Sequence, residues 1–129
     1  MATQPLTSAG NRSPFCESLD ALSTLENGWD SYSAPAPNAT AIENAKALVN
    51  EADSLHTTPE RVEPSAMGGV GVTFSADKRE VVIEFYNRGT AHALFSNDST
   101  GTMHTLAVST DPVGYRSIIG EVRKYLYGE

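Results

Sequence analysis

The stretch that decides the fold runs from residue 70 to residue 86 and reads Val70-Gly71-Val72-Thr73-Phe74-Ser75-Ala76-Asp77-Lys78-Arg79-Glu80-Val81-Val82-Ile83-Glu84-Phe85-Tyr86. Apolar side chains occupy every second position in two runs, at 70, 72 and 74 and again at 81, 83 and 85. A period of two is typical of β-strands that bury one face. Because residues 76–78 form a turn-like break between the runs, the sequence predicts an antiparallel hairpin.

The same pattern continues after this hairpin. We expect a turn at residues 87–89, a third strand over residues 90–96, a turn over residues 97–101 and a fourth strand over residues 102–108. Parallel strands need long crossover connections, whereas these loops hold only a few residues. The sequence therefore predicts a four-stranded antiparallel sheet in which consecutive strands pair.

Two helical patterns precede the sheet. Ser13-Pro14 offers a cap and a first-turn proline for one helix, which Asn27-Gly28 is expected to end. Asn38 is expected to cap a second helix. The predicted buried side of that second helix consists of Ala41, Ile42, Ala45, Leu48, Val49 and Ala52.

A third helical pattern follows the sheet. Asp111-Pro112 supplies its cap and first residue, and Gly128 is a natural end. The predicted fold class is therefore α+β, with two N-terminal helices, a four-stranded antiparallel sheet and a C-terminal helix in the order α-α-β-β-β-β-α. Residues 1–12 are predicted to be a flexible tail, and residues 13–129 a single domain.

Composition limits the classes of function. The formal net charge of −7 disfavours direct binding to nucleic acid, because such a chain repels phosphates. Cys16 is the only cysteine, so no disulfide can form within the chain. The N-terminus lacks the pattern of a signal peptide, and no apolar run is long enough to span a bilayer. These features predict a soluble, cytoplasmic protein that does not contact membranes.

The negative charge is concentrated in the first half of the chain. Residues 1–60 hold eight acidic residues against two basic ones, a net of −6, while residues 61–129 have a net of −1. One interpretation is a solvated helical face; the other is a surface that docks on a basic protein partner. The predicted partner-binding residues are Glu17, Asp20, Asp30, Tyr32, Glu43, Glu51 and Asp53.

The only tryptophan lies between the first two predicted helices, in Gly28-Trp29-Asp30-Ser31-Tyr32-Ser33-Ala34. The prolines that follow forbid helix through this segment. The favoured interpretation buries Trp29 as a plug between helix and sheet, with Asp30 bonding local amides in an Asx turn. The alternative makes Trp29 and Tyr32 binding anchors, because aromatic residues dominate binding hot spots.

Residues with catalytic potential are scattered. Cys16 falls in an amphipathic helix without a predictable base, and the glycines at 68, 69 and 71 lead into a strand instead of a phosphate-binding helix. If the turn between them is centred on Asp98, His92 and His104 lie opposite each other across the hairpin, whereas a change of one residue in the turn moves them to opposite faces. We therefore predict no catalytic residue, metal or cofactor. A small ligand-binding or hydrolytic domain that uses His92, His104 and Glu84 is the alternative.

Two segments resemble a known group of sequences. One contains Trp29-Asp30-Ser31-Tyr32-Ser33-Ala34, and the other contains Pro64-Ser65 followed by Gly68-Gly69-Val70. They resemble small bacterial and phage proteins with a W-D-x-Y-x-A turn and a P-S-x-x-G-G-V strand entry, over roughly residues 25–86. The group has no assigned activity to transfer. The resemblance implies a protein of bacteria or their mobile elements. Such a context favours a role in defence or counter-defence by association.

These observations predict a non-catalytic, acidic protein-binding module. Its concrete form is a mobile-element inhibitor that covers a basic surface of a bacterial nucleic-acid-processing complex, as anti-CRISPR proteins do. A third alternative is a dimeric assembly module that pairs through a sheet edge.

Overall fold

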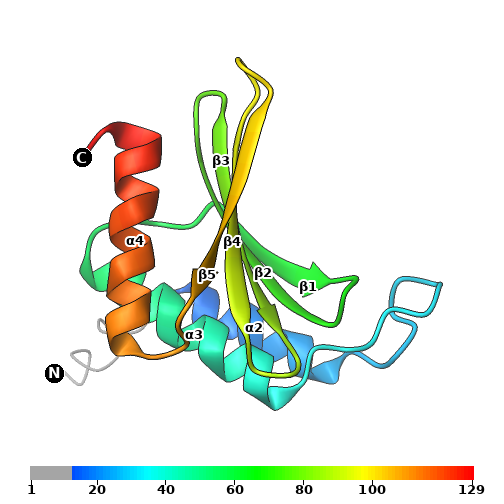
Figure 1. Cartoon of the computed structure of the whole chain (residues 1–129). Helices are drawn as coiled ribbons and strands as arrows, with labels where there is room; N and C mark the ends of the chain where they lie inside the picture. Colours follow the sequence, from blue (N-terminus) through cyan, green and yellow to red (C-terminus); the bar gives the residue numbers. More distant parts are fainter. Residues whose placement is uncertain (1–12) are drawn as a thin grey trace, which may run out of the picture.

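The computed structural model describes residues 13–129, so the predicted tail at residues 1–12 lies outside the described part. Helix α2 (Phe15–Ala21), the short 3₁₀ helix η1 (Leu22–Thr24) and helix α3 (Ala39–Ser54) precede the sheet. Strands β1 (Arg61–Ser65), β2 (Gly69–Ala76), β3 (Arg79–Tyr86), β4 (Ala91–Asn97) and β5 (Thr102–Val108) follow, and helix α4 (Pro112–Tyr127) ends the chain (Figure 1).

The sheet is antiparallel and its strands lie in the order β1-β2-β3-β4-β5. The α+β class and the meander are confirmed, but the prediction of four strands is wrong because β1 adds a fifth. β1 contains Pro64 and two exposed charged residues, Arg61 and Glu63. A short strand of this composition has little apolar alternation of its own, and proline in a sheet is confined mainly to edges. Its pairing with β2 is what makes it a strand.

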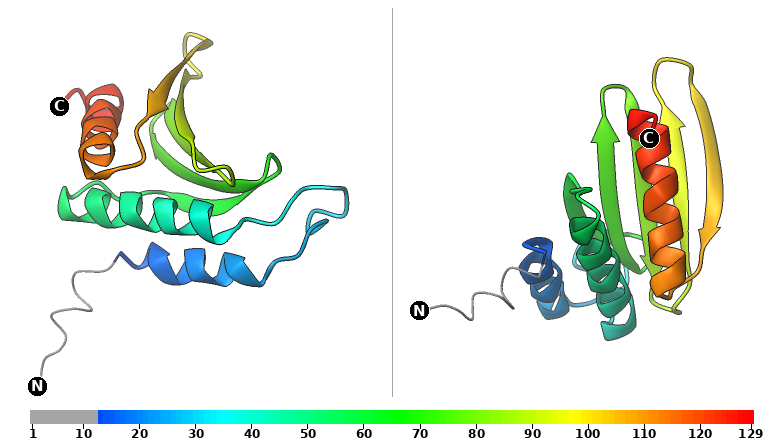
Figure 2. Two further views of the ribbon diagram at one scale, coloured as in Figure 1. Left: turned by 60° about the horizontal axis from the view of Figure 1, so that its bottom comes forward. Right: turned by 90° about the vertical axis from the view of Figure 1, so that its left-hand side faces the viewer.

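Helices α2, α3 and α4 cover one face of the sheet, and within residues 13–129 no helix covers the other face (Figure 2). The covered face carries the alternating side chains that predicted the hairpin, and the pairing sets Val72 opposite Ile83 and Phe74 opposite Val81. One hydrophobic cluster joins these strands to residues of α2, α3 and α4. Its largest fully buried side chains are Phe74, Phe85, Phe95, Leu19, Leu48, Ile83 and Ile119.

The predicted caps of the two long helices are confirmed. The side chain of Asn38 accepts a hydrogen bond from the Ala41 amide at 3.0 Å, and that of Asp111 accepts one from the Gly114 amide at 2.7 Å. Gly128 ends α4 in the left-handed conformation, with φ of 80°. These short-range signals place both helices correctly.

The first helix is shorter than predicted. The α-helical part ends at Ala21 and a 3₁₀ turn ends at Thr24, before Asn27-Gly28. Two hydroxyl groups explain the early end, since Ser23 and Thr24 each donate to a main-chain carbonyl three residues earlier, at 2.7 and 2.8 Å. Such side-chain bonds compete with continued helix.

Candidate functional site

The loop between α2 and α3 is held in one conformation by its own polar groups. Asp30 Oδ1 accepts from the Tyr32 amide at 2.9 Å and from the Ala34 amide at 3.3 Å, which confirms the predicted Asx turn. The Gly28 amide donates to the Ala34 carbonyl at 2.8 Å and closes the base of the loop. Ser31 adopts a φ of +70°, a conformation that non-glycine residues rarely take. The loop is therefore ordered despite its exposure.

A second set of contacts ties the loop to the sheet. The Asn87 side chain donates to the Ala36 carbonyl at 2.9 Å and accepts from the Asn38 amide at 2.9 Å. The Asn38 side chain returns a bond to the Asn87 carbonyl at 2.9 Å. The β1–β2 turn also packs against the loop, since a Cβ atom added at Gly68 would lie 3.3 Å from the Pro35 ring. We call these contacts around Asn87 the Asn87 clamp.

The two aromatic residues of the loop differ in environment. Trp29 is half-buried and lies outside the hydrophobic core, so the prediction that it plugs the gap between helix and sheet is wrong. Its indole Nε1 donates to the Pro35 carbonyl at 3.1 Å and braces the loop. The loop between α2 and α3 extends away from the sheet before it returns to α3 (Figure 1), and Trp29, which belongs to this loop, therefore does not reach the core. Tyr32 is 87% exposed, the most exposed large hydrophobic side chain in residues 13–129.

The predicted acidic residues of the helices fall into two groups. Asp20 of α2 and Glu43 of α3 share Lys46, whose Nζ lies 2.8 and 3.3 Å from their carboxylate oxygens. The bond from Lys46 to Asp20 raises the pKa of the Lys46 amine. Both carboxylates stay more than half exposed, at 52% and 67%. They thus belong to one surface across the two helices.

The remaining predicted residues lie further along the helices. Glu51 is half-buried and 3.9 Å from a guanidinium nitrogen of Arg116, so the C-terminal helix neutralises part of its charge. Glu17 is exposed, and Asp53 is half-buried near the end of α3. Glu43 and Glu51 are separated by about 12 Å along the helix axis at 1.5 Å per residue. The structure therefore brings Asp20 and Glu43 together, but not all seven predicted residues.

The helix-free face of the sheet holds a separate polar cluster. Glu84 lies directly opposite His92, and the Tyr86 hydroxyl lies 3.0 Å from Nε2 of His92. Burial, followed by the Glu84 charge, raises the pKa of Tyr86. Gly71 lies across from Glu84, and a Cβ atom there would come within 3.1 Å of Glu84 Oε2. Within residues 13–129, the buried Glu84 Oε1 has no hydrogen-bond partner.

His104 lies on the other face of the sheet. It pairs with Phe95 and stacks on that ring at 4.6 Å between centroids. The β4–β5 loop holds four residues between Asn97 and Thr102, so the turn is not centred on Asp98 and the two histidines do not share a face. The alternative that joins His104 to His92 and Glu84 in one site is therefore wrong. No group of three metal-ligating side chains occurs in the described chain.

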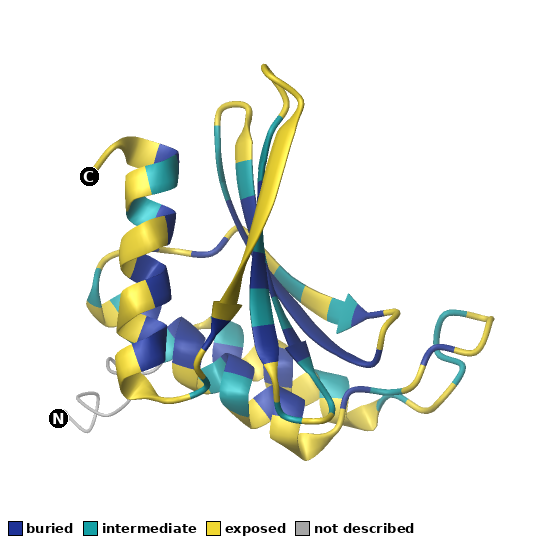
Figure 3. Cartoon of the chain, viewed as in Figure 1, coloured by how far each residue is buried: buried dark blue, intermediate teal, exposed yellow. Residues whose placement is uncertain are grey.

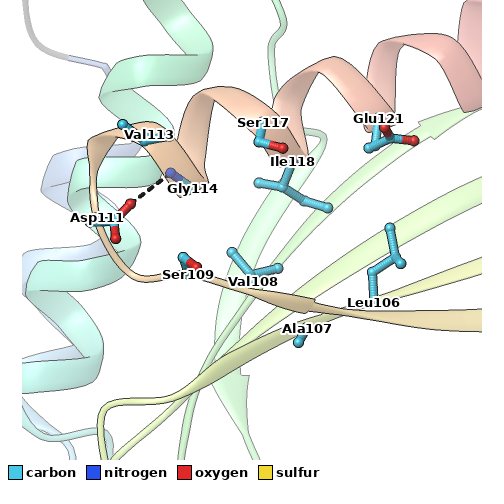
Figure 4. Close-up of a pocket in the computed structure, with 10 residues that line it drawn as sticks. All are labelled: Leu106, Ala107, Val108, Ser109, Asp111, Val113, Gly114, Ser117, Ile118 and Glu121. Atoms are coloured by element: carbon cyan, nitrogen blue, oxygen red, sulfur yellow. Dashed lines mark hydrogen bonds between the residues drawn. The ribbon is translucent and has the colours of Figure 1, made fainter.

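A groove that the sequence did not predict lies between β5 and α4. One pocket of about 290 Å³ lies where Leu106 and Val108 face the first turns of α4, beside Ile118 (Figure 4). A second pocket of about 300 Å³ is lined by His104 and Tyr125 nearer the other end of the strand. Glu121 lines both pockets, so the two adjoin along the edge strand, and we call them together the β5 groove.

No family model, curated protein or solved structure matches the chain. In the part of the chain that the structure covers, none of the helices has the length and apolar character needed to cross a membrane.

Proposed function

We propose that the protein is a non-catalytic protein-binding module that contacts its partner through the loop around Tyr32 and the adjacent acidic helices. The observation that carries this proposal is the display of Tyr32. Its side chain is 87% exposed, yet the loop beneath it is fixed by the Asx turn and the Asn87 clamp. Ordering an exposed loop costs conformational entropy that a purely connecting loop need not lose.

A fixed aromatic residue suits protein recognition for two reasons. Tyrosine offers a large apolar ring with a polar tip, and few torsions are lost when it is buried by a partner. A loop that is already ordered also avoids the entropic cost of ordering during association. Trp29 stabilises the loop through the hydrogen bond from its indole to the Pro35 carbonyl, while Tyr32 remains exposed to a partner.

The charge around the loop favours a basic partner. Residues 13–54 carry seven carboxylates against the single Lys46. α2 and α3 lie side by side, and the loop connects them (Figure 2). Such a surface accelerates encounter with a basic protein and repels phosphate backbones. Nucleic-acid-processing complexes carry basic surfaces, so a mobile-element inhibitor of a bacterial defence complex remains the concrete form of the proposal.

Two matched tyrosines test the proposal. Affinity purification from the native host supplies the partner, whose binding is then measured with Tyr32→Ala and with Tyr127→Ala, a control tyrosine that is 53% exposed on α4. We expect Tyr32→Ala to accelerate dissociation and weaken binding by about 2 kcal/mol or more, with little effect of the control. Equal effects of the two substitutions would refute the role of the loop.

The acidic surface has its own test with the same partner. Glu43→Lys is expected to slow association, and Glu80→Lys on β3, whose side chain is 41% exposed, is the control. The difference between these variants should shrink as salt is raised, because the Debye length falls below roughly 8 Å above physiological ionic strength. Binding that ignores ionic strength would refute the acidic contact while leaving the role of Tyr32 to the first test.

A further inference from the structure

The two edges of the sheet differ in composition. β1 carries Arg61, Glu63 and Pro64, the kinds of residue that discourage pairing with another strand. β5, Thr102–Val108, has no charged residue and no proline, and every residue except Val108 is exposed. Figure 2 shows β5 at the rim of the sheet with nothing beside its outer edge, and Figure 3 shows the strand coloured as exposed over nearly its whole length. A seven-residue edge of this kind offers unpaired main-chain groups to another strand.

We propose that β5 pairs with β5 of a second copy of this chain, in an antiparallel dimer whose two-fold axis passes beside Thr105. The two sheets would then form one continuous sheet of ten strands. The middle of the strand fixes the register, because only centring on Thr105 pairs all seven residues. An antiparallel pair related by a two-fold axis is self-complementary, since each residue meets the same environment in both copies.

The side chains fit this register. Thr105 lies opposite the partner's Thr105, and Met103 lies opposite the partner's Ala107, so a large side chain meets a small one. On the helix-covered side, Leu106 lies opposite the partner's His104. Met103 and Leu106 are 64% and 40% exposed in the single chain, and both would be covered at least in part. No charged residue of either strand faces another.

The charges flanking the strand favour a second copy over an unrelated strand. Beside Thr102 the β5 groove is lined by Arg79 and Lys124 against one carboxylate, Glu121, and beside Val108 it is lined by the carboxylates of Asp111 and Glu121, so the first end is net basic and the second acidic. Antiparallel pairing places the Thr102 end of each copy next to the Val108 end of its partner. The basic end of one groove therefore meets the acidic end of the other, twice in each dimer.

A charge exchange at the axis tests this pairing. The mass of the wild-type chain in solution is measured by sedimentation from about 1 to 500 µM, a span suited to weak interfaces. We expect a concentration-dependent dimer. Thr105→Lys and Thr105→Glu each place like charges opposite one another and should raise the dissociation constant roughly fivefold or more. An equimolar mixture of the two variants should restore the dimer, because Lys then faces Glu.

The matched control is Thr90→Lys, which places the same charge at an exposed position before β4. This variant should dimerise like the wild type, and the circular dichroism of all variants should match that of the folded chain. A wild type that is monomeric throughout, variants at Thr105 that dimerise normally, or a mixture that stays monomeric would each overturn the proposal. Binding at Tyr32 is independent of these outcomes.

Discussion

The substitution Asn87→Ala tests the long-range contact that orders the loop around Tyr32. It removes the bond to the Ala36 carbonyl and the bond from the Asn38 amide, each 2.9 Å long. A hydrogen bond contributes about 1 kcal/mol net, so the two together predict a loss of about 2 kcal/mol in the free energy of unfolding. The bond from the Asn38 side chain to the main-chain carbonyl of residue 87 can remain, so the fold should survive.

The loss can be measured by urea unfolding followed by far-UV circular dichroism, with Trp29 fluorescence as a local probe. The control is Asn97→Ala at the end of β4, which removes only a local 2.9 Å bond from the Ser99 amide. We expect this control to lose about 1 kcal/mol or less. In Asn87→Ala, the fluorescence of Trp29 should change at a lower urea concentration than the circular dichroism of the sheet, because the loop opens before the rest of the fold.

A second variant separates the two bonds of the clamp. Asn87→Asp keeps an oxygen for the Asn38 amide but sets a carboxylate oxygen against the Ala36 carbonyl. It should therefore be at least as unstable as Asn87→Ala. If Asn87→Ala were no less stable than Asn97→Ala, the claim that the clamp orders the loop would be refuted.

Three further predictions concern the scaffold. Asp111→Ala should lower the free energy of unfolding by about 1 kcal/mol in urea titrations, because the bond that caps α4 is lost. Gly69→Ala should abolish the cooperative thermal transition, because φ is +140° and a Cβ atom would overlap the Phe85 carbonyl. Burial raises the pKa of Tyr115 above its ordinary value of 10.0, so the folded chain retains this proton to higher pH than the unfolded chain does. The free energy of unfolding should therefore fall above about pH 10. The urea midpoint should drop between about pH 9 and pH 11, and this drop should be smaller in Tyr115→Phe than in the wild type.

The sequence by itself determined the elements whose signals lie within a few residues. The alternation at Val70, Val72 and Phe74 predicted a strand with one buried face, and Asp111 predicted the start of α4. Period and capping depend on the local backbone, so no distant residue is needed to read them. The short connections also predicted the antiparallel meander, because they cannot hold a crossover.

Only the tertiary structure decided features that depend on contacts between distant residues. β1 is a strand because β2 pairs with it, and Asn87 matters because its partners lie 49 and 51 residues earlier. The faces of His92 and His104 depend on the register across a loop, and one residue more or less would reverse one of them. Trp29 stabilises the loop instead of packing in the core, because the loop that carries it extends away from the sheet. Local periodicity carries no information on such contacts, because folding, and not sequence proximity, brings the groups together.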